Sequence, residues 1–141
     1  MRIKQAESRE LPSLVALAYK LWPQAEDLEE EFLQNMADGA FFLAYQEVTP
    51  VGFAQCQLRH DYVEGTESSP VGYLEGVYVE EEYRRHGIGK ALVAACQQWA
   101  KSRGCSEFAS DCELSNRESL QFHLSAGFQE ANRIVCFTKK L

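Results

Sequence analysis

Residues 77–90 decide the fold class of this chain and read Val77-Tyr78-Val79-Glu80-Glu81-Glu82-Tyr83-Arg84-Arg85-His86-Gly87-Ile88-Gly89-Lys90. The pattern predicts a strand, an acidic turn and a glycine-containing loop that opens an amphipathic helix. Glycines let the backbone approach a ligand, and the first helical turn offers unpaired N–H groups at the positive end of its dipole. The stretch therefore predicts an anion site suited to a phosphate or pyrophosphate, to which Arg84, Arg85 and Lys90 add positive charge.

Two other phosphate-binding loops do not fit this stretch. A P-loop needs glycine at position 84 and Ser or Thr at position 91, where the chain has Arg84 and Ala91. A dinucleotide fingerprint needs a third glycine near position 92, which is Leu92. What remains is the pattern Arg-x-x-Gly-x-Gly after a predicted strand that ends at Val79.

Length and charge limit the class of protein. We expect the 141 residues to form one domain, residues 1–141. No apolar run reaches the roughly 18–20 residues of a membrane span, and the N-terminus lacks a signal-peptide core, so a cytoplasmic protein is expected. The formal net charge of −7 argues against nucleic acid as the main partner. It suits a cationic substrate, although solubility alone would also account for it.

The cysteines are odd in number and contain no CxxC pair. We expect reduced, structural residues rather than nucleophiles or metal ligands. The three histidines do not space with them as zinc ligands, so no metal site is predicted. The cysteines are Cys56, Cys96, Cys105, Cys112 and Cys136.

Hydrophobic periodicity predicts an α/β sheet with helices on both faces. Ser8 is expected to cap the first helix, and Ser115 to Glu118 fit a capping box before the last one. Residues 61–70 form a polar loop. The strand patterns cover residues 1–5, 40–46, 51–59, 71–79, 107–112 and 134–139, and the helical patterns cover residues 9–22, 26–37, 87–103 and 116–126.

One carboxylate falls inside a predicted central strand. Alternation places Glu75 on the same face as Val71, Tyr73, Val77 and Val79. A carboxylate among apolar neighbours rarely lacks a partner. Glu75 is therefore either an active-site base or ammonium anchor, or a paired structural carboxylate.

More acidic residues lie near the predicted ends of strands. Asp111 ends residues 107–112, and strand ends line the binding crevice of open α/β sheets. If it faces Glu75 across that crevice, the pair would attract a polycation; otherwise Asp111 is a capping or turn residue. Asp61, Glu64 and Glu67 either rim the same pocket or are solvated surface charges.

Aromatic and polar side chains complete the candidate site. Tyr62 and Tyr73 either offer ring faces to a sugar or cation, or serve in packing. Asn116, Ser119 and His123 form one polar stripe on the last predicted helix. An imidazole exchanges protons near neutral pH, so His123 is either a general acid or a satisfied polar residue.

These motifs together resemble the GCN5-related N-acetyltransferase (GNAT) superfamily. The loop fits its pyrophosphate loop, and the last helix begins Asn116-x-x-Ser119 and precedes Gly127-Phe128. More specific strings, spread over residues 11–137, resemble the small, chromosomally encoded aminoglycoside 6'-N-acetyltransferases. These strings are Leu21-Trp22-Pro23, Asp61-Tyr62-Val63-x-Gly65-Thr66-x-x-Ser69-Pro70-Val71, Leu74-Glu75-Gly76 and Glu107-Phe108-Ala109-Ser110-Asp111.

The resemblance implies a GNAT acyltransferase fold, a mixed and mostly antiparallel sheet whose central strands splay apart. Acetyl-CoA would bind in that cleft, with its pantetheine arm along the strand edge and its pyrophosphate on the loop. The implied cofactor-binding residues are Val77, Val79, Arg84, Arg85, His86, Gly87, Ile88, Gly89, Lys90, Asn116 and Ser119.

The resemblance also implies an aminoglycoside substrate. The implied substrate-binding residues are Trp22, Tyr62, Glu64, Tyr73, Glu75 and Asp111. Glu75 and Asp111 would hold its ammonium groups and take the proton from the 6'-amine. Many superfamily members carry a tyrosine as general acid where this chain has His123, so the implied catalytic residues are Glu75, Asp111 and His123.

The expected function is direct acetyl transfer from acetyl-CoA to an aminoglycoside 6'-amine, an antibiotic-resistance activity, by a homodimer. One alternative is an acetyltransferase for another small amine, a polyamine or a peptide N-terminus. Another is a non-catalytic acyl-CoA-binding sensor on the same fold. The acidic residues gathered around Glu75 favour the polycationic substrate.

Overall fold

A mixed five-stranded sheet forms the centre of the computed structural model, which describes residues 1–141. The strands lie in the order β1-β2-β3-β4-β5; β5 runs parallel to β4, and the other neighbours are antiparallel. They are β1 (Arg2–Gln5), β2 (Ala40–Gln46), β3 (Thr49–Arg59), β4 (Val71–Val79) and β5 (Phe108–Ala109). The helices are α1 (Leu11–Leu21), α2 (Leu28–Asn35), α3 (Ile88–Ser102) and α4 (Arg117–Ser125), with 3-10 turns at Ser8–Glu10 and Glu81–Tyr83.

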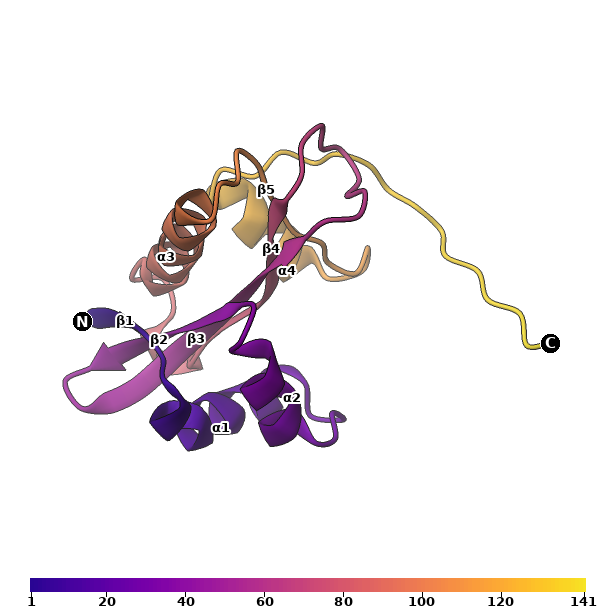
Figure 1. The fold of residues 1–141 in the computed structure, drawn as a ribbon. Helices are drawn as coiled ribbons and strands as arrows, with labels where there is room; N and C mark the ends of the chain where they lie inside the picture. Colours follow the sequence, from indigo (N-terminus) through magenta and orange to yellow (C-terminus); the bar gives the residue numbers. More distant parts are fainter.

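Helices cover both faces of the sheet, as predicted (Figure 1). Alternation along β3 sends Phe53 into the core under α1 and α2, where it meets Phe32, and sends Ala54 to the opposite core under α3, with Leu92. All four of these side chains are fully buried. No helix combines the length and apolar character needed to cross a membrane.

A bulge interrupts β4 at Glu75. Two consecutive residues of β3 pair with Gly76 and Leu74, so Glu75 has no residue opposite it. Leu74, Val77 and Val79 consequently all pack toward α3, whereas Glu75 and Gly76 face the end of α1. The prediction that Glu75 shares a face with Val77 and Val79 is wrong, because one extra residue inverts the alternation beyond it.

Two helix starts also differ from the prediction. Ser8 does not cap α1, because it lies inside a 3-10 turn that follows Glu7 and precedes the helix. Asn116, rather than Ser115, caps α4: its Oδ1 accepts the Ser119 N–H at 3.0 Å. The amide oxygen thereby satisfies one of the unpaired donors of the first turn.

The predicted strand at residues 134–139 is not formed. Residues 129–141 contain no helix or strand and run away from the sheet as an extended segment (Figure 1). Ile134, Val135 and Phe137 are 70%, 77% and 88% exposed. The segment has the composition of a strand, but it pairs with no edge of the sheet, and without inter-strand hydrogen bonds it forms no strand.

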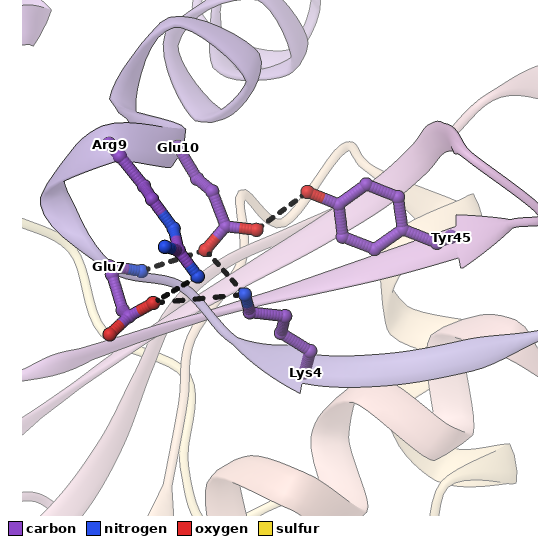
Figure 2. Close-up of polar contacts among 5 residues, drawn as sticks. All are labelled: Lys4, Glu7, Arg9, Glu10 and Tyr45. Carbon is purple, nitrogen blue, oxygen red and sulfur yellow. Dashed lines mark hydrogen bonds and ion pairs between the residues drawn. The ribbon is translucent and has the colours of Figure 1, made fainter.

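A polar network fastens the start of α1 to the sheet (Figure 2). The Glu10 carboxylate accepts hydrogen bonds from Tyr45 Oη at 2.7 Å and the Glu7 N–H at 3.0 Å, and pairs with Lys4 Nζ at 3.2 Å. Arg9 pairs with Glu7 at 2.8 Å. Burial disfavours the charged form of Glu10, but these partners together outweigh it and lower its pKa.

Candidate active site

An open cavity of about 760 Å³ lies between the end of α1, α2 and the sheet. Trp22 follows α1 directly and lies edge-on to Phe32 and Phe53. A Cβ on Gly76 would lie 2.5 Å from the Trp22 ring, so this glycine makes room for the wall of the cavity. Polar groups line much of it; the lining residues are Leu21, Trp22, Pro23, Gln24, Ala25, Leu28, Glu31, Asn35, Gln55, Gln57 and Glu75.

Three of the predicted substrate-site residues are linked through Arg59. Its Nη2 lies 3.1 Å from both carboxylate oxygens of Glu75, and its guanidinium carbon lies 3.5 Å from the centre of the Tyr73 ring. The Tyr73 hydroxyl donates a hydrogen bond to Asp111. Glu75 and Asp111 therefore belong to one network beside the cavity, joined through Arg59 and Tyr73 rather than by direct contact.

Tyr73 serves this network as a hydrogen-bond donor. Burial first, and then the hydrogen bond to Asp111, raise the pKa of Tyr73 well above its ordinary value. The phenol keeps its proton at neutral pH and holds the Asp111 carboxylate just beyond the end of β5.

The β4 edge beside β5 is open over most of its length. The two strands pair only at Gly72 with Phe108 and at Tyr73 with Ala109. The splayed strand pair implied by the resemblance is therefore present. The Val79 carbonyl already accepts a hydrogen bond from Arg84 Nε at 2.8 Å.

The loop before α3 presents a row of free backbone donors. Arg85 and Gly87 have left-handed backbone angles, with φ of 67° and 82°. None of the N–H groups of residues 85–90 donates a hydrogen bond within the chain. A Cβ on Gly89 would lie 2.8 Å from the Phe122 ring, so this glycine also lets α4 approach the loop. The row has the character of an anion cradle.

His123 faces the splayed strands through Ser110. Its Nδ1 lies 2.7 Å from the Ser119 carbonyl oxygen, which can only accept, so Nδ1 carries the proton. Its Nε2 lies 2.8 Å from Ser110 Oγ, which is 3.2 Å from the Leu74 carbonyl on β4. The polar stripe of α4 thus points toward the cleft, and Asn116 is engaged in the helix cap.

Four predicted substrate-binding residues lie outside the cavity lining. Tyr73 and Asp111 are linked to Glu75 through Arg59, whereas Tyr62 and Glu64 are not. Tyr62 is 75% exposed on the loop of residues 61–70, and its hydroxyl is 3.4 Å from Glu64. Glu64 also accepts a hydrogen bond from Asn132 at 2.6 Å. Glu107 accepts hydrogen bonds from the Glu67 N–H and the Ser68 hydroxyl. These contacts order the loop but do not bring Tyr62 or Glu64 to Glu75.

Sequence reasoning missed several residues of the site. Gln55, Gln57 and Arg59 lie at every second position of β3, on the face that carries the cavity. This polar row in an otherwise apolar strand is the signal that would have found them. Ser110 left no signal beyond its neighbour Asp111.

The cysteines and acidic groups form no further cluster. All five cysteines are unpaired; Cys56, Cys96 and Cys105 are buried, but Cys112 and Cys136 are exposed. No group of three or more His, Cys, Asp or Glu side chains is arranged to hold a metal ion.

Comparison with known proteins identifies relatives over the whole chain. The model of the Acetyltransferase (GNAT) family matches residues 3–128. An aminoglycoside N(6')-acetyltransferase type 1 from Stenotrophomonas maltophilia is 45% identical over 142 residues, covering 99% of this chain and 93% of the relative. The structure of AAC(6')-Iy with the bisubstrate analog CoA-S-monomethyl-acetylneamine has a TM-score of 0.92, 37% identity and coverage of 99% and 98%. That of Acinetobacter baumannii AAC(6')-Ih, an aminoglycoside 6'-N-acetyltransferase, has a TM-score of 0.93, 38% identity and the same coverage.

Proposed function

This chain belongs to the GNAT acetyltransferase family, and we propose that residues 1–141 act as one catalytic domain that acetylates the 6'-amine of aminoglycosides with acetyl-CoA. The position of Glu75 carries the proposal. Its side chain lines the cavity, and its place on β4 is just beyond the short pairing with β5. An amine in the cavity and a thioester in the cleft would meet beside one carboxylate. The full-length similarity to enzymes named for this substrate supports the substrate class.

Acetyl-CoA fits the open half of the molecule. Its pantetheine amides would pair with the free β4 edge near Val77 and Val79, and its pyrophosphate would accept hydrogen bonds from the N–H groups of residues 85–90. Arg84, His86 and Lys90 line or flank this cradle, and Asn116 and Ser119 approach the arm from α4. When bound, acetyl-CoA supplies the activated acetyl group.

Glu75 and Asp111 would prepare the amine for attack. An alkyl amine with a pKa of roughly 8–10 arrives protonated at neutral pH. One carboxylate holds the ammonium, and the other, directly or through water, accepts a proton from it. The freed amine forms the C–N bond to the acetyl carbon, its nitrogen loses a second proton to water, and the C–S bond then breaks to give the amide and the thiolate. A backbone N–H of residues 76–79 would stabilise the oxyanion that forms between these steps.

His123 is the proposed general acid toward the departing thiolate. Because Nδ1 donates to the Ser119 carbonyl, the route to the cleft runs from Nε2 through the Ser110 hydroxyl. Ser110 would pass a proton to the sulfur and regain one from Nε2 of the doubly protonated His123, while the Nδ1 proton stays in its hydrogen bond to the Ser119 carbonyl. No cysteine is needed as a nucleophile in this scheme.

The active form is proposed to be a homodimer in the cytoplasm. The extended segment of residues 129–141 exposes Ile134, Val135 and Phe137 to water, and a second copy of the chain would cover them. The two-residue strand β5 leaves a free sheet edge for such a partner. The unpaired cysteines fit a reducing compartment. Sedimentation should give a dimer, and removal of residues 130–141 should give a monomer; an unchanged mass after truncation would contradict this interface.

Regiospecific turnover tests the reaction. Thiol release from acetyl-CoA should occur with tobramycin and with kanamycin A, and should be absent with analogues that carry a 6'-hydroxyl group. Turnover of other amines, with none on aminoglycosides, would move the function to a different acetyl acceptor.

A Glu75→Ala variant tests the assignment of the carboxylate. It should lose aminoglycoside turnover and still bind CoA, because residues 85–90 do not contact Glu75. Retained turnover in a folded Glu75→Ala protein, or a loss of CoA binding as the only defect, would sink the assignment. The matched control is Glu29→Ala, which removes an exposed carboxylate of α2 that does not line the cavity.

A further inference from the structure

Arg59 lies where the cation of a substrate would bind. One guanidinium nitrogen is 3.1 Å from both oxygens of Glu75, and the group stacks 3.5 Å above the Tyr73 ring. The same ring hydroxyl bonds to Asp111. An aromatic face flanked by two carboxylates is the environment that an ammonium group seeks.

We propose that Arg59 is a built-in occupant of this cation site, which a polycationic substrate displaces. The inference rests on the proposed function, in which Glu75 holds a substrate ammonium group. It adds that Arg59 lowers the affinity for every amine that must displace it, and so determines which class of amine is accepted.

The position of Arg59 allows it to leave. It is the last residue of β3, its side chain is 44% exposed, and its only hydrogen bonds go to Glu75. Ion pairs this exposed are weak, because water competes for both partners. The long side chain can turn into solvent without moving the strand or the wall of the cavity.

The formal charges at the site indicate which amines can displace Arg59. Glu75 and Asp111 carry two formal negative charges, and Arg59 neutralises one of them. A monoamine replaces one cation by another and gains little. A substrate with several ammonium groups replaces Arg59 on Glu75 and reaches Asp111 as well, so the exchange becomes favourable. Arg59 thus discriminates against small monoamines at a moderate cost in affinity for polyamines.

The test is the affinity of tobramycin for the protein saturated with CoA, measured by calorimetry so that no acetyl transfer occurs. Arg59→Gln should lower the Kd for tobramycin by about threefold to tenfold, the value of one exposed ion pair with a stacking contact. With acetyl-CoA, the KM for tobramycin should fall. The preference for tobramycin over 6-amino-6-deoxyglucose, a monoamine, should shrink.

Arg103→Gln is the matched control. Arg103 stacks on Trp99 at 5.1 Å beyond the end of α3, so this variant changes the net charge equally without touching the site. Equal tightening in both variants would assign the effect to net charge and overturn the proposal. In a Glu75→Gln background the gain from Arg59→Gln should disappear, because Arg59 no longer competes for a carboxylate.

The outcomes separate this inference from the proposed function. Tighter binding by Arg59→Gln alone supports it, whereas unchanged or weaker tobramycin binding in a folded Arg59→Gln protein overturns it and leaves the acetyltransferase function standing. A wild-type protein that binds no aminoglycoside overturns both. Unchanged thermal unfolding temperatures establish that each variant is folded.

Discussion

The two tyrosine–carboxylate networks of this molecule use the same parts for different ends. At the start of α1, Glu10 joins a lysine and Tyr45 (Figure 2). At the end of β3, Arg59 joins Glu75 and stacks on Tyr73, which bonds to Asp111. Each contains a cation, a phenol and a carboxylate, so residue types alone do not separate a structural network from a functional one.

The two networks differ in how many partners within the chain each carboxylate has. Glu10 has three partners within the chain, and its side chain is 12% exposed. Glu75 has Arg59 alone, and its side chain is 21% exposed and opens into a cavity. A carboxylate with unused acceptors beside a cavity is available to a ligand, whereas one surrounded by its own chain stabilises the fold.

The largest effect expected from this comparison concerns catalysis. Glu75→Gln should lower kcat/KM for tobramycin by about 100-fold or more, because the amide can neither accept the proton nor balance the ammonium charge. Glu10→Gln should leave kcat/KM unchanged. Thiol-release assays on both variants measure kcat/KM. Equal losses of kcat/KM would show that the two carboxylates do not differ in function.

The next effect is on the free energy of unfolding, where Glu10→Gln should lose more than Glu75→Gln. Glu10→Gln should lower the free energy of unfolding by about 1.5–3 kcal/mol, since hydrogen bonds to a charged, largely buried group are lost. Glu75→Gln should cost less than about 1 kcal/mol, because the Arg59 pair is exposed. Urea unfolding of the two variants measures both values; a greater loss for Glu75→Gln would reverse the assignment of roles.

A smaller difference is expected between the phenols. Tyr45→Phe should lower the free energy of unfolding by about 0.5–1.5 kcal/mol, the value of one hydrogen bond, without altering turnover. Tyr73→Phe should instead weaken tobramycin binding, because Asp111 loses the donor that holds it beside the cavity. A Tyr73→Phe protein with wild-type affinity for tobramycin would separate Tyr73 from the site.

The last effect is a dependence on pH. The pKa of Glu10 is lowered in the folded protein from its ordinary value of 4.5. Its stabilisation is therefore complete above that value and is lost as the pH falls through the lowered one. As the pH falls below 4.5, the unfolding free energies of the wild type and Glu10→Gln should converge. Parallel curves over this range would mean that Glu10 does not titrate with folding.

The sequence-based predictions succeeded where one strand or helix determines its own pattern. Strand β4 has the predicted bounds Val71–Val79, and Gly87 marks the start of α3. One of the two alternatives for Asp111, a place near Glu75, also rested on strand ends, and the two carboxylates are linked through Arg59 and Tyr73. Each of these features depends on local periodicity or on a general rule of sheet topology.

The features that were not predicted depend on pairing between segments. The bulge at Glu75 is a mismatch between two strands and leaves no mark on either one. Residues 134–139 have the pattern of a strand but pair with no other strand of the chain. Arg59 at a strand end has the pattern of a solvated charge until Tyr73 and Glu75 are placed next to it.

The free N–H groups of residues 85–90 have a consequence for isotope exchange. Six consecutive amides without an internal acceptor should exchange with solvent deuterium rapidly in the unliganded protein. A bound pyrophosphate would supply acceptors to several of them together, without any internal hydrogen bond being broken first. Deuterium uptake along this one short segment would then report how much of the protein carries its cosubstrate, independently of which amine is offered for acetylation.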